Sequence, residues 1–191
     1  MVEAFPKHYQ RLYDRINELS ARFPLRTVLE LGCGVGHFVG FLREQGFLAE
    51  GIDGKTDLFR DDLMDYLHQG QLTDLKQVFG DRRFDMIVGR GVVCHGSQYD
   101  YSYGSRQDAG WLVVMSALDP QVKRELEKRV QAKIERILES SFNQLMPDGL
   151  LAVCEDIDTD DKIGFSMEAA QRIGYHVLSY EIQEAVLQKP K

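Results

Sequence analysis

The chain has 191 residues, of which 43% are hydrophobic and 28% charged, and these values are ordinary for one globular domain with a full core. Its net charge of −7 argues against nucleic-acid binding through a broadly basic surface, although a local basic groove would be compatible with this charge. There is no signal-peptide pattern or membrane-length apolar run, and the cysteines, Cys33, Cys94 and Cys154, have no C-x-x-C spacing. We therefore expect a cytoplasmic protein with reduced thiols and no membrane partner.

The first predicted element is an amphipathic helix over residues 7–22. Its apolar and aromatic positions recur at helical spacing and stop before Pro24; they are Tyr9, Leu12, Tyr13, Ile16 and Leu19. We treat residues 1–24 as a cap helix and residues 25–191 as the domain that it covers. The two tyrosines either pack on the sheet or reach a site beside it.

A strand, a glycine turn and a helix are predicted from the string VLELGCGVGHF, which begins at Val28. The buried strand Val28–Leu31 leads into Gly32, Gly34 and Gly36, and helical spacing then continues to Gly46. Glycine at alternate positions removes the Cβ atoms that would keep a ligand away from the backbone. Such a unit is the nucleotide-binding element of an open α/β sheet.

A second strand is predicted over Leu48–Ile52, and it ends at Asp53. In open sheets, an acid at this place lies beside the nucleoside sugar, where its oxygens can accept both ribose hydroxyls. The alternative is an aspartate that only caps its own turn. Its position relative to the glycine turn favours the ligand-binding role.

Two further segments frame the expected site. Residues 55–67 carry three acids, Asp61, Asp62 and Asp65, which are either ligand-binding or solvated helix residues. The string FDMIVGRGVVCHG then predicts a fourth strand with residues 86–88 buried. Because the first and fourth strands flank the point where ligands bind in such sheets, we expect residues 89–95 to lie next to the glycine turn.

The polar, glycine-rich residues 96–110 carry tyrosines at alternate positions, Tyr99, Tyr101 and Tyr103. A binding loop and a short edge hairpin explain this pattern equally well. An N-cap and first-turn pair, Asp119 and Pro120, starts a helix that runs to Met146, with a mixed-charge face expected in solvent.

The C-terminal part begins with a turn at residues 147–149, followed by a strand over Leu150–Cys154. The acidic residues 155–161 imitate a calcium loop but lack its glycine and its bidentate acid, so we expect no metal site. A short helix over Ser166–Ile173 precedes two strands, residues 175–182 and 184–188. Their very short connection permits only an antiparallel pair.

The string E-x-G-x-G-x-G at Glu30–Gly36 differs from the dinucleotide fingerprint G-x-G-x-x-G and resembles motif I of class I S-adenosylmethionine-dependent methyltransferases. The F-D-x-I-V start of the fourth strand, the string LMPDGLLAV and the terminal hairpin are also similar to that family. The resemblance implies a single Rossmann-like domain: a mostly parallel seven-stranded sheet with a C-terminal antiparallel hairpin and helices on both faces.

The resemblance also implies site residues, with S-adenosylmethionine as cofactor and S-adenosylhomocysteine as product. The expected cofactor-binding residues are Glu30, Gly32, Gly34, Gly36, Asp53, Gly54, Asp62 and Leu63. In the family an acid that follows the third strand commonly binds the adenine amine; Asp62 followed by Leu63 resembles that element, and Asp61 and Asp65 are its rivals. His95 is the candidate general base, because an imidazole titrates near neutral pH. It can equally serve only to tie down its loop, since Gly91 and Cys94 replace the acids of the family's E-x-x-E-H element. The candidate substrate-binding residues are Tyr9, Tyr13, Tyr99, Tyr101 and Tyr103.

The implied reaction is methyl transfer to an oxygen or nitrogen of a small molecule or of a peptide or protein side chain. The N-P-P-Y and D-P-P-Y strings of base and glutamine methyltransferases are absent, as are the clustered acids of metal-dependent catechol-type enzymes. Two alternatives stay open: a catalytically silent partner subunit with the same fold, and a nicotinamide-dependent oxidoreductase. The oxidoreductase should carry G-x-G-x-x-G.

Overall fold

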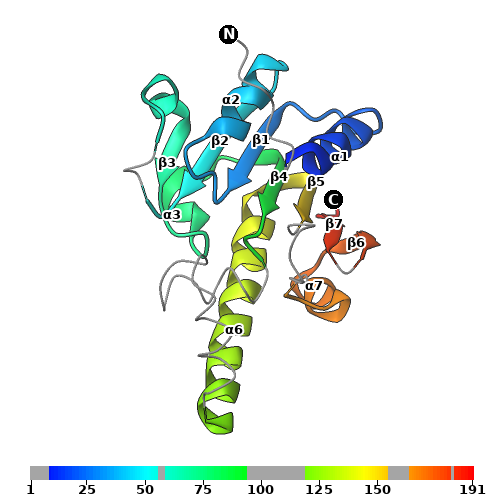
Figure 1. Ribbon diagram of the computed structural model, residues 1–191. Coiled ribbons are helices and arrows are strands. Elements are labelled where there is room, and N and C mark those ends of the chain that lie inside the picture. Colours follow the sequence, from blue (N-terminus) through cyan, green and yellow to red (C-terminus); the bar gives the residue numbers. More distant parts are fainter. Residues whose placement is uncertain (1–8, 56–58, 94–118, 155–163, 182) are drawn as a thin grey trace.

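The structure, a computed structural model, describes residues 9–55, 59–93, 119–154, 164–181 and 183–191 (Figure 1). They form a seven-stranded sheet with the order β3-β2-β1-β4-β5-β7-β6. The strands are β1 (Thr27–Leu31), β2 (Leu48–Asp53), β3 (Leu67–Gln69), β4 (Phe84–Arg90), β5 (Leu145–Cys154), β6 (His176–Tyr180) and β7 (Glu184–Gln188). The first five run parallel, whereas β7 is antiparallel to both β5 and β6. The expected sheet and its terminal hairpin are confirmed.

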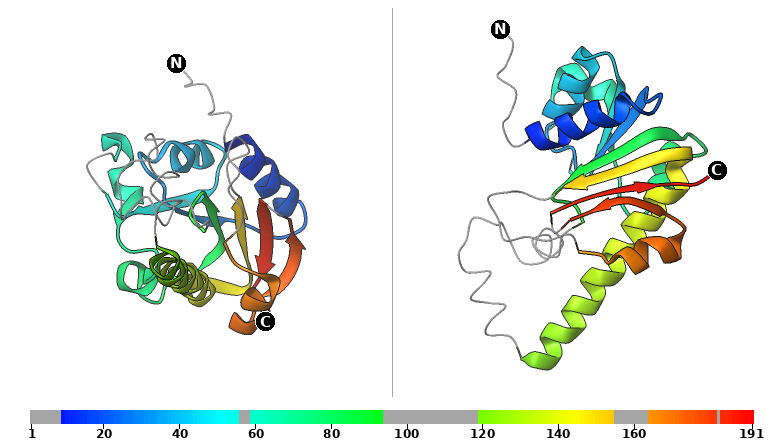
Figure 2. Two further views of the ribbon diagram at one scale, coloured as in Figure 1. Left: turned by 60° about the horizontal axis from the view of Figure 1, so that its bottom comes forward. Right: turned by 90° about the vertical axis from the view of Figure 1, so that its right-hand side faces the viewer.

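Helices cover both faces of the sheet, as expected (Figure 2). On one face lie α1 (Gln10–Ser20) and α2 (His37–Glu44), which bury their apolar residues against one core cluster. On the other face lie α3 (Leu75–Phe79), α6 (Pro120–Gln144) and α7 (Met167–Ile173), which pack on a second cluster. Each helix turns an apolar stripe to the sheet, so the two cores hold the carboxyl ends of the strands in fixed positions.

The ends of several elements carry the capping residues that the sequence predicts. The Asp119 carboxylate accepts a hydrogen bond from the Gln121 N–H at 2.8 Å, and Pro120 follows as the first helical residue. At α7, the Ser166 hydroxyl accepts from the Ala169 N–H, and Gly174 ends the helix with a φ of 116°.

The turn expected at residues 147–149 lies inside β5. Phe84 pairs with Leu145 and Met86 with Leu150, so the four residues between them bulge out of the strand. Asp148 takes a φ of 62°, a conformation that aspartate tolerates better than most residues. The bulge lets β5 pair with β4 on both sides of a local turn sequence.

The long helix α6 leaves the sheet at the carboxyl edge of the strands. Its C-terminal part packs on the sheet through Ile134, Ile137 and Leu138, whereas its N-terminal half extends beyond that edge (Figures 1 and 2). Across the described ranges, no helix has the length and apolar character needed to cross a membrane.

Candidate functional site

The glycine turn lies between β1 and β4 at the carboxyl edge, where the strand order reverses. Gly34 has a φ of 53°, and a Cβ atom built on it would meet nothing within 4 Å. Gly32, in contrast, lies against the end of β4, because a Cβ there would come within 2.6 Å of Val92 Cγ1. The turn therefore presents bare backbone to open space at Gly34, and residues 91–93 adjoin it as expected.

Asp53 ends β2 and connects it to this turn. Its side chain is only 8% exposed. The Gly34 N–H donates to Oδ2 at 3.0 Å, and the Lys55 N–H donates to Oδ1 at 3.0 Å. Asp53 thus does more than cap its own turn, since it also holds the glycine turn, and each carboxylate oxygen keeps a lone pair for a ligand donor.

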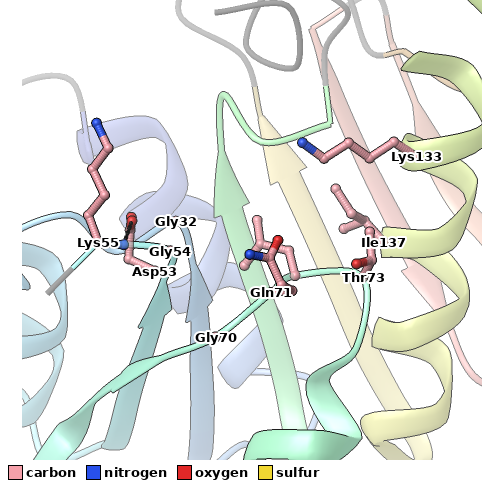
Figure 3. Close-up of a pocket in the computed structure, with 10 residues that line it drawn as sticks. Gly32, Asp53, Gly54, Lys55, Gly70, Gln71, Thr73, Lys133 and Ile137 are labelled. Atoms are coloured by element: carbon pink, nitrogen blue, oxygen red, sulfur yellow. Dashed lines mark hydrogen bonds between the residues drawn. The ribbon is translucent and has the colours of Figure 1, made fainter. Parts of the chain in front are cut away.

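A cavity of about 280 Å³ opens beside Asp53, close to the lower end of the usual size of small-molecule sites (Figure 3). Its wall combines four parts of the chain: the glycine turn, the end of β2, the segment after β3, and α6. The lining residues are Gly32, Asp53, Gly54, Lys55, Gly70, Gln71, Leu72, Thr73, Lys133 and Ile137. Polar and apolar groups thus meet around one hollow, as a nucleoside requires.

The acids expected after the third strand lie before it. Asp61, Asp62 and Asp65 belong to a 3-10 helix, Asp61–Tyr66, that leads into β3. The Asp62 side chain is 62% exposed and pairs with Arg60 at 2.7 Å. Leu63 is buried in the core that contains α2. The expected placement of Asp62 and Leu63 after the third strand is therefore wrong.

Gln71 and Leu72 occupy the place after β3 and line the cavity. The sequence offers little signal for them, because a strand of three residues is too short for a recognisable hydrophobic pattern. Lys133 and Ile137 were also missed. They lie on a helix whose charged residues were expected to be solvated, yet Lys133 is half-buried and burial lowers the pKa of its ammonium group.

Glu30 lies in β1, two residues before Gly32, and is 2% exposed. The Tyr9 hydroxyl, the backbone N–H of Val39 and the guanidinium of Arg90 lie close enough to its carboxyl group to favour the charged form. Burial is the largest influence, and together these surroundings raise the pKa of Glu30 to about 8. Oε2 of Glu30 accepts no hydrogen bond from a described residue.

The Val39 N–H near Glu30 belongs to the first turn of α2. Gly36 is the N-cap of that helix and has no side chain with which to cap it, so the carboxyl group of Glu30 is the acid beside this helix start. A carboxyl group in this position repels phosphate when it is ionised. The start of α2 is therefore poorly suited to the pyrophosphate of a dinucleotide.

The two tyrosines of the first helix have different surroundings. The Tyr9 ring stacks on Phe38, with centroids 4.6 Å apart and planes at 8°, and the Arg90 guanidinium lies 4.9 Å from its centroid. Tyr13 instead packs edge-on against Phe41 and donates its hydroxyl to Gln45 at 3.3 Å. Only Tyr9 is therefore part of the group around Glu30.

Several expected residues lie outside the described parts of the chain. They are His95, Tyr99, Tyr101, Tyr103, Cys94 and the acidic residues 155–161. Within the parts that the structure describes, no group of histidine, cysteine and acidic side chains is arranged to hold a metal ion.

Comparison with known proteins identifies the family. A family model described as a methyltransferase domain matches residues 5–183, and no curated protein matches the chain. Among solved structures, S-adenosylmethionine-bound CalS10, an amino pentose methyltransferase from Micromonospora echinaspora, is 13% identical with a TM-score of 0.61, covering 96% of this chain and 92% of that chain.

Two further structures have the same fold. The sugar N-methyltransferase KedS8 from Streptoalloteichus sp. is 12% identical with a TM-score of 0.58, covering 100% of this chain and 96% of that chain. A TehB-like S-adenosylmethionine-dependent methyltransferase from Corynebacterium glutamicum is 18% identical with a TM-score of 0.53, covering 97% of this chain and 100% of that chain. Because the family model spans nearly the whole sequence, the chain belongs to the class I S-adenosylmethionine-dependent methyltransferases.

Proposed function

We propose that this methyltransferase transfers the methyl group to an oxygen or nitrogen nucleophile of a small molecule or of a peptide or protein side chain. The main support for this proposal is the cavity at the carboxyl edge of the sheet. Asp53 lines this cavity, and backbone N–H groups orient both of its carboxylate oxygens. These residues fit S-adenosylmethionine. Gly34 and Gly54 each face open space where a Cβ would otherwise stand, so the backbone admits a ligand on both sides of Asp53.

Different residues of the cavity contact the ribose and the adenine of the donor. Asp53 accepts the two ribose hydroxyls, since each of its oxygens still has a lone pair. Gln71 presents a side-chain amide whose oxygen accepts the exocyclic amine of adenine. Leu72 and Ile137 supply apolar surface beside the base. Gln71 thus takes the role that sequence reasoning assigned to Asp62.

Glu30 receives the amino-acid end of the donor. It lies in β1, two residues before Gly32, and its Oε2 accepts no hydrogen bond from a described residue. An ammonium group is the natural partner of such an oxygen, because it brings both a charge and N–H donors. Glu30, by contrast, leaves no suitable place for the pyrophosphate of a nicotinamide cofactor.

When bound, the donor supplies a methyl group on a positively charged sulfur, which an in-line displacement discharges. The chain contributes positioning and the exclusion of water. Val92 and Val93 are buried just after β4, and Val92 lies against Gly32, so they form an apolar border for the acceptor. We retain His95 as the candidate general base and Tyr99, Tyr101 and Tyr103 as candidate substrate contacts, because they follow directly on β4 in the sequence.

Calorimetry with S-adenosylmethionine, S-adenosylhomocysteine and a nicotinamide dinucleotide tests the cofactor. We expect the first two to bind and the dinucleotide not to bind; the reverse result would sink the proposal. Methyl-labelled donor incubated with amino sugars is a sensible first acceptor assay, since two similar structures are described as amino pentose and sugar N-methyltransferases. Donor binding without transfer to any fraction of a host extract would support the silent-subunit alternative.

A further inference from the structure

A second cavity is lined by residues around α3 and on the C-terminal half of α6. Its volume is about 460 Å³, which is within the usual range of small-molecule sites. Thr73 lines both this cavity and the cavity beside Asp53, here called the donor cavity, so the two adjoin. Their other lining residues differ, and the second cavity is therefore a separate hollow that the donor contacts proposed above do not use.

Hydrogen bonds hold the two sides of the second cavity together. The N–H of Leu75, the first residue of α3, donates to the Ser140 hydroxyl of α6 at 2.8 Å. Gln144, only 1% exposed, donates through its side-chain amide to the carbonyl of Gly80, the C-cap of α3, at 3.1 Å. Both ends of α3 are thus attached to α6, so the cavity is already formed in the ligand-free protein.

Three cationic side chains from different parts of the fold line the second cavity. Lys76 lies on α3, Arg83 directly before β4, and Arg136 on α6. None of the three forms an ion pair with a residue that the structure describes. Arg83 donates to the carbonyl of Arg82 at 3.2 Å, which leaves most of its N–H groups for a ligand. A hollow with several uncompensated cations attracts anions.

Neutral donors and two carboxylates complete the lining of the second cavity. The Ser140 hydroxyl accepts from a backbone N–H and keeps its own proton for a ligand, and the Asn143 amide offers two further N–H donors. Asp74 and Glu139 contribute the carboxylates. Carboxylate oxygens repel an anion but accept hydrogen bonds from hydroxyl groups. The lining therefore fits a ligand that carries both an anionic group and hydroxyl groups.

We propose that the second cavity binds a small phosphate monoester with free hydroxyl groups, such as a sugar phosphate: Lys76, Arg83 and Arg136 bind the phosphate. Asp74 and Glu139 accept hydrogen bonds from the hydroxyls. A phosphate monoester suits three cations better than a carboxylate does, because it carries nearly two charges at neutral pH and three terminal oxygens. The planar guanidinium groups can each bind two of these oxygens. A free phosphate ion would leave the carboxylates without a partner.

Calorimetric titration with glucose 6-phosphate, inorganic phosphate and glucose tests the site. We expect glucose 6-phosphate to bind most tightly, inorganic phosphate more weakly, and glucose not at all at the same concentrations. Salt should weaken the binding of both phosphates, since the cations are at least partly exposed. Saturating S-adenosylhomocysteine should leave these affinities unchanged. Competition would place the phosphate in the donor cavity and overturn the proposal.

Arg136→Gln removes one cation from an exposed position on α6 and should not disturb folding. We expect the affinities for glucose 6-phosphate and for inorganic phosphate each to fall about tenfold, the effect of one lost charged hydrogen bond. Arg129→Gln is the matched control, because Arg129 lies about two turns earlier on the same helix and pairs with Glu125 at 3.3 Å. It should keep both affinities. Equal losses in the two variants would mean that only the charge of the helix matters, and the proposed site would be wrong.

Glu139→Ala separates the hydroxyl contacts from the phosphate contacts. It should weaken glucose 6-phosphate about threefold, because an acceptor for the hydroxyls is lost. Inorganic phosphate should bind at least as tightly as before, since a like charge is removed. Thermal denaturation verifies that each variant is folded. If glucose 6-phosphate fails to bind at millimolar concentrations, or binds no more tightly than inorganic phosphate, the proposal is overturned.

Discussion

Gly34 combines a left-handed backbone with open space on its ligand side. In Gly34→Val, a branched side chain would fill the place of the donor, and the backbone strain would cost about 1–2 kcal/mol of stability. We expect donor binding to fall below detection in calorimetry. Gly46→Val is the matched control, because Gly46 also has a positive φ and open space but lies after α2, at the other end of that helix from the glycine turn. It should lose stability and keep donor affinity.

Gln71 and Asp62 are competing candidates for the adenine amine, one indicated by the cavity and the other by sequence reasoning. Gln71→Ala removes a polar group from the cavity wall, and we expect donor affinity to fall about tenfold, the effect of one lost hydrogen bond. Asp62→Ala removes an exposed carboxylate paired with Arg60 and should leave affinity unchanged. Equilibrium binding of S-adenosylhomocysteine to both variants decides, and the opposite ranking would restore Asp62.

Asp53 is the residue on which the nucleoside site depends most. Asp53→Asn keeps the shape of the side chain but puts an NH₂ group where a carboxylate oxygen accepts from a backbone N–H. Because hydrogen bonds to a charged acceptor are worth about 1.5–3 kcal/mol, donor affinity should fall by at least about tenfold. Calorimetry measures this loss. Unchanged affinity would mean that Asp53 only stabilises the two turns and does not bind the donor.

At the scale of elements, α1 is attached to β7 by ions as well as by apolar packing. Glu184, only 6% exposed, accepts hydrogen bonds from Arg11 at 2.8 Å and from Arg15. Glu184→Gln removes the buried anion that both guanidinium groups share. The arginines are partly exposed, so we expect a loss of about 1–3 kcal/mol in the free energy of unfolding rather than the larger cost of a fully buried pair.

Glu18→Gln is the control for this prediction. It removes the exposed partner of Arg15 on α1 itself and should change stability by less than about 1 kcal/mol. Chemical denaturation measures both variants. Equal effects would show that the attachment to β7 adds little.

At the same scale, the sequence predicts best the elements with long regular patterns. The helix from Asp119 and the strands around Val28 and Met86 were expected because their period and caps extend over many residues. The third strand was misplaced, since β3 has only three residues and follows a 3-10 helix rather than an α-helix. The start of β4 is held by Thr27, whose hydroxyl and N–H both donate to Asp85, a contact that no local pattern predicts.

At the scale of the whole molecule, Glu30 should make stability depend on pH. Its folded pKa of about 8 lies above the ordinary value of 4.5, so the folded state binds more protons than the unfolded state between these values. The contribution of Glu30 to the free energy of unfolding is therefore greatest below about pH 4.5 and declines as the pH rises to about 8. Glu30→Gln should flatten this decline, by a few kcal/mol over the range.

Denaturation over this pH range measures the effect. Glu50 acts in the opposite direction: burial alone would raise its pKa, but hydrogen bonds from His68 and Arg82 outweigh burial and lower it. Its contribution is therefore lost only in acid, below the ordinary range of a glutamate. A decline between about 4.5 and 8 that persists in Glu30→Gln would show that another group is responsible.

By itself, the sequence determined the class of fold, the order of most elements and the glycine turn of a methyl-donor site. Hydrophobic period, caps and turn residues act over a few positions, so they can be recognised in a single chain. The tertiary structure decided what the site residues contact: Gly34 with Asp53, Tyr9 with Phe38, and α6 with the cavity. These contacts join residues far apart in the chain, and their geometry depends on packing across the whole sheet.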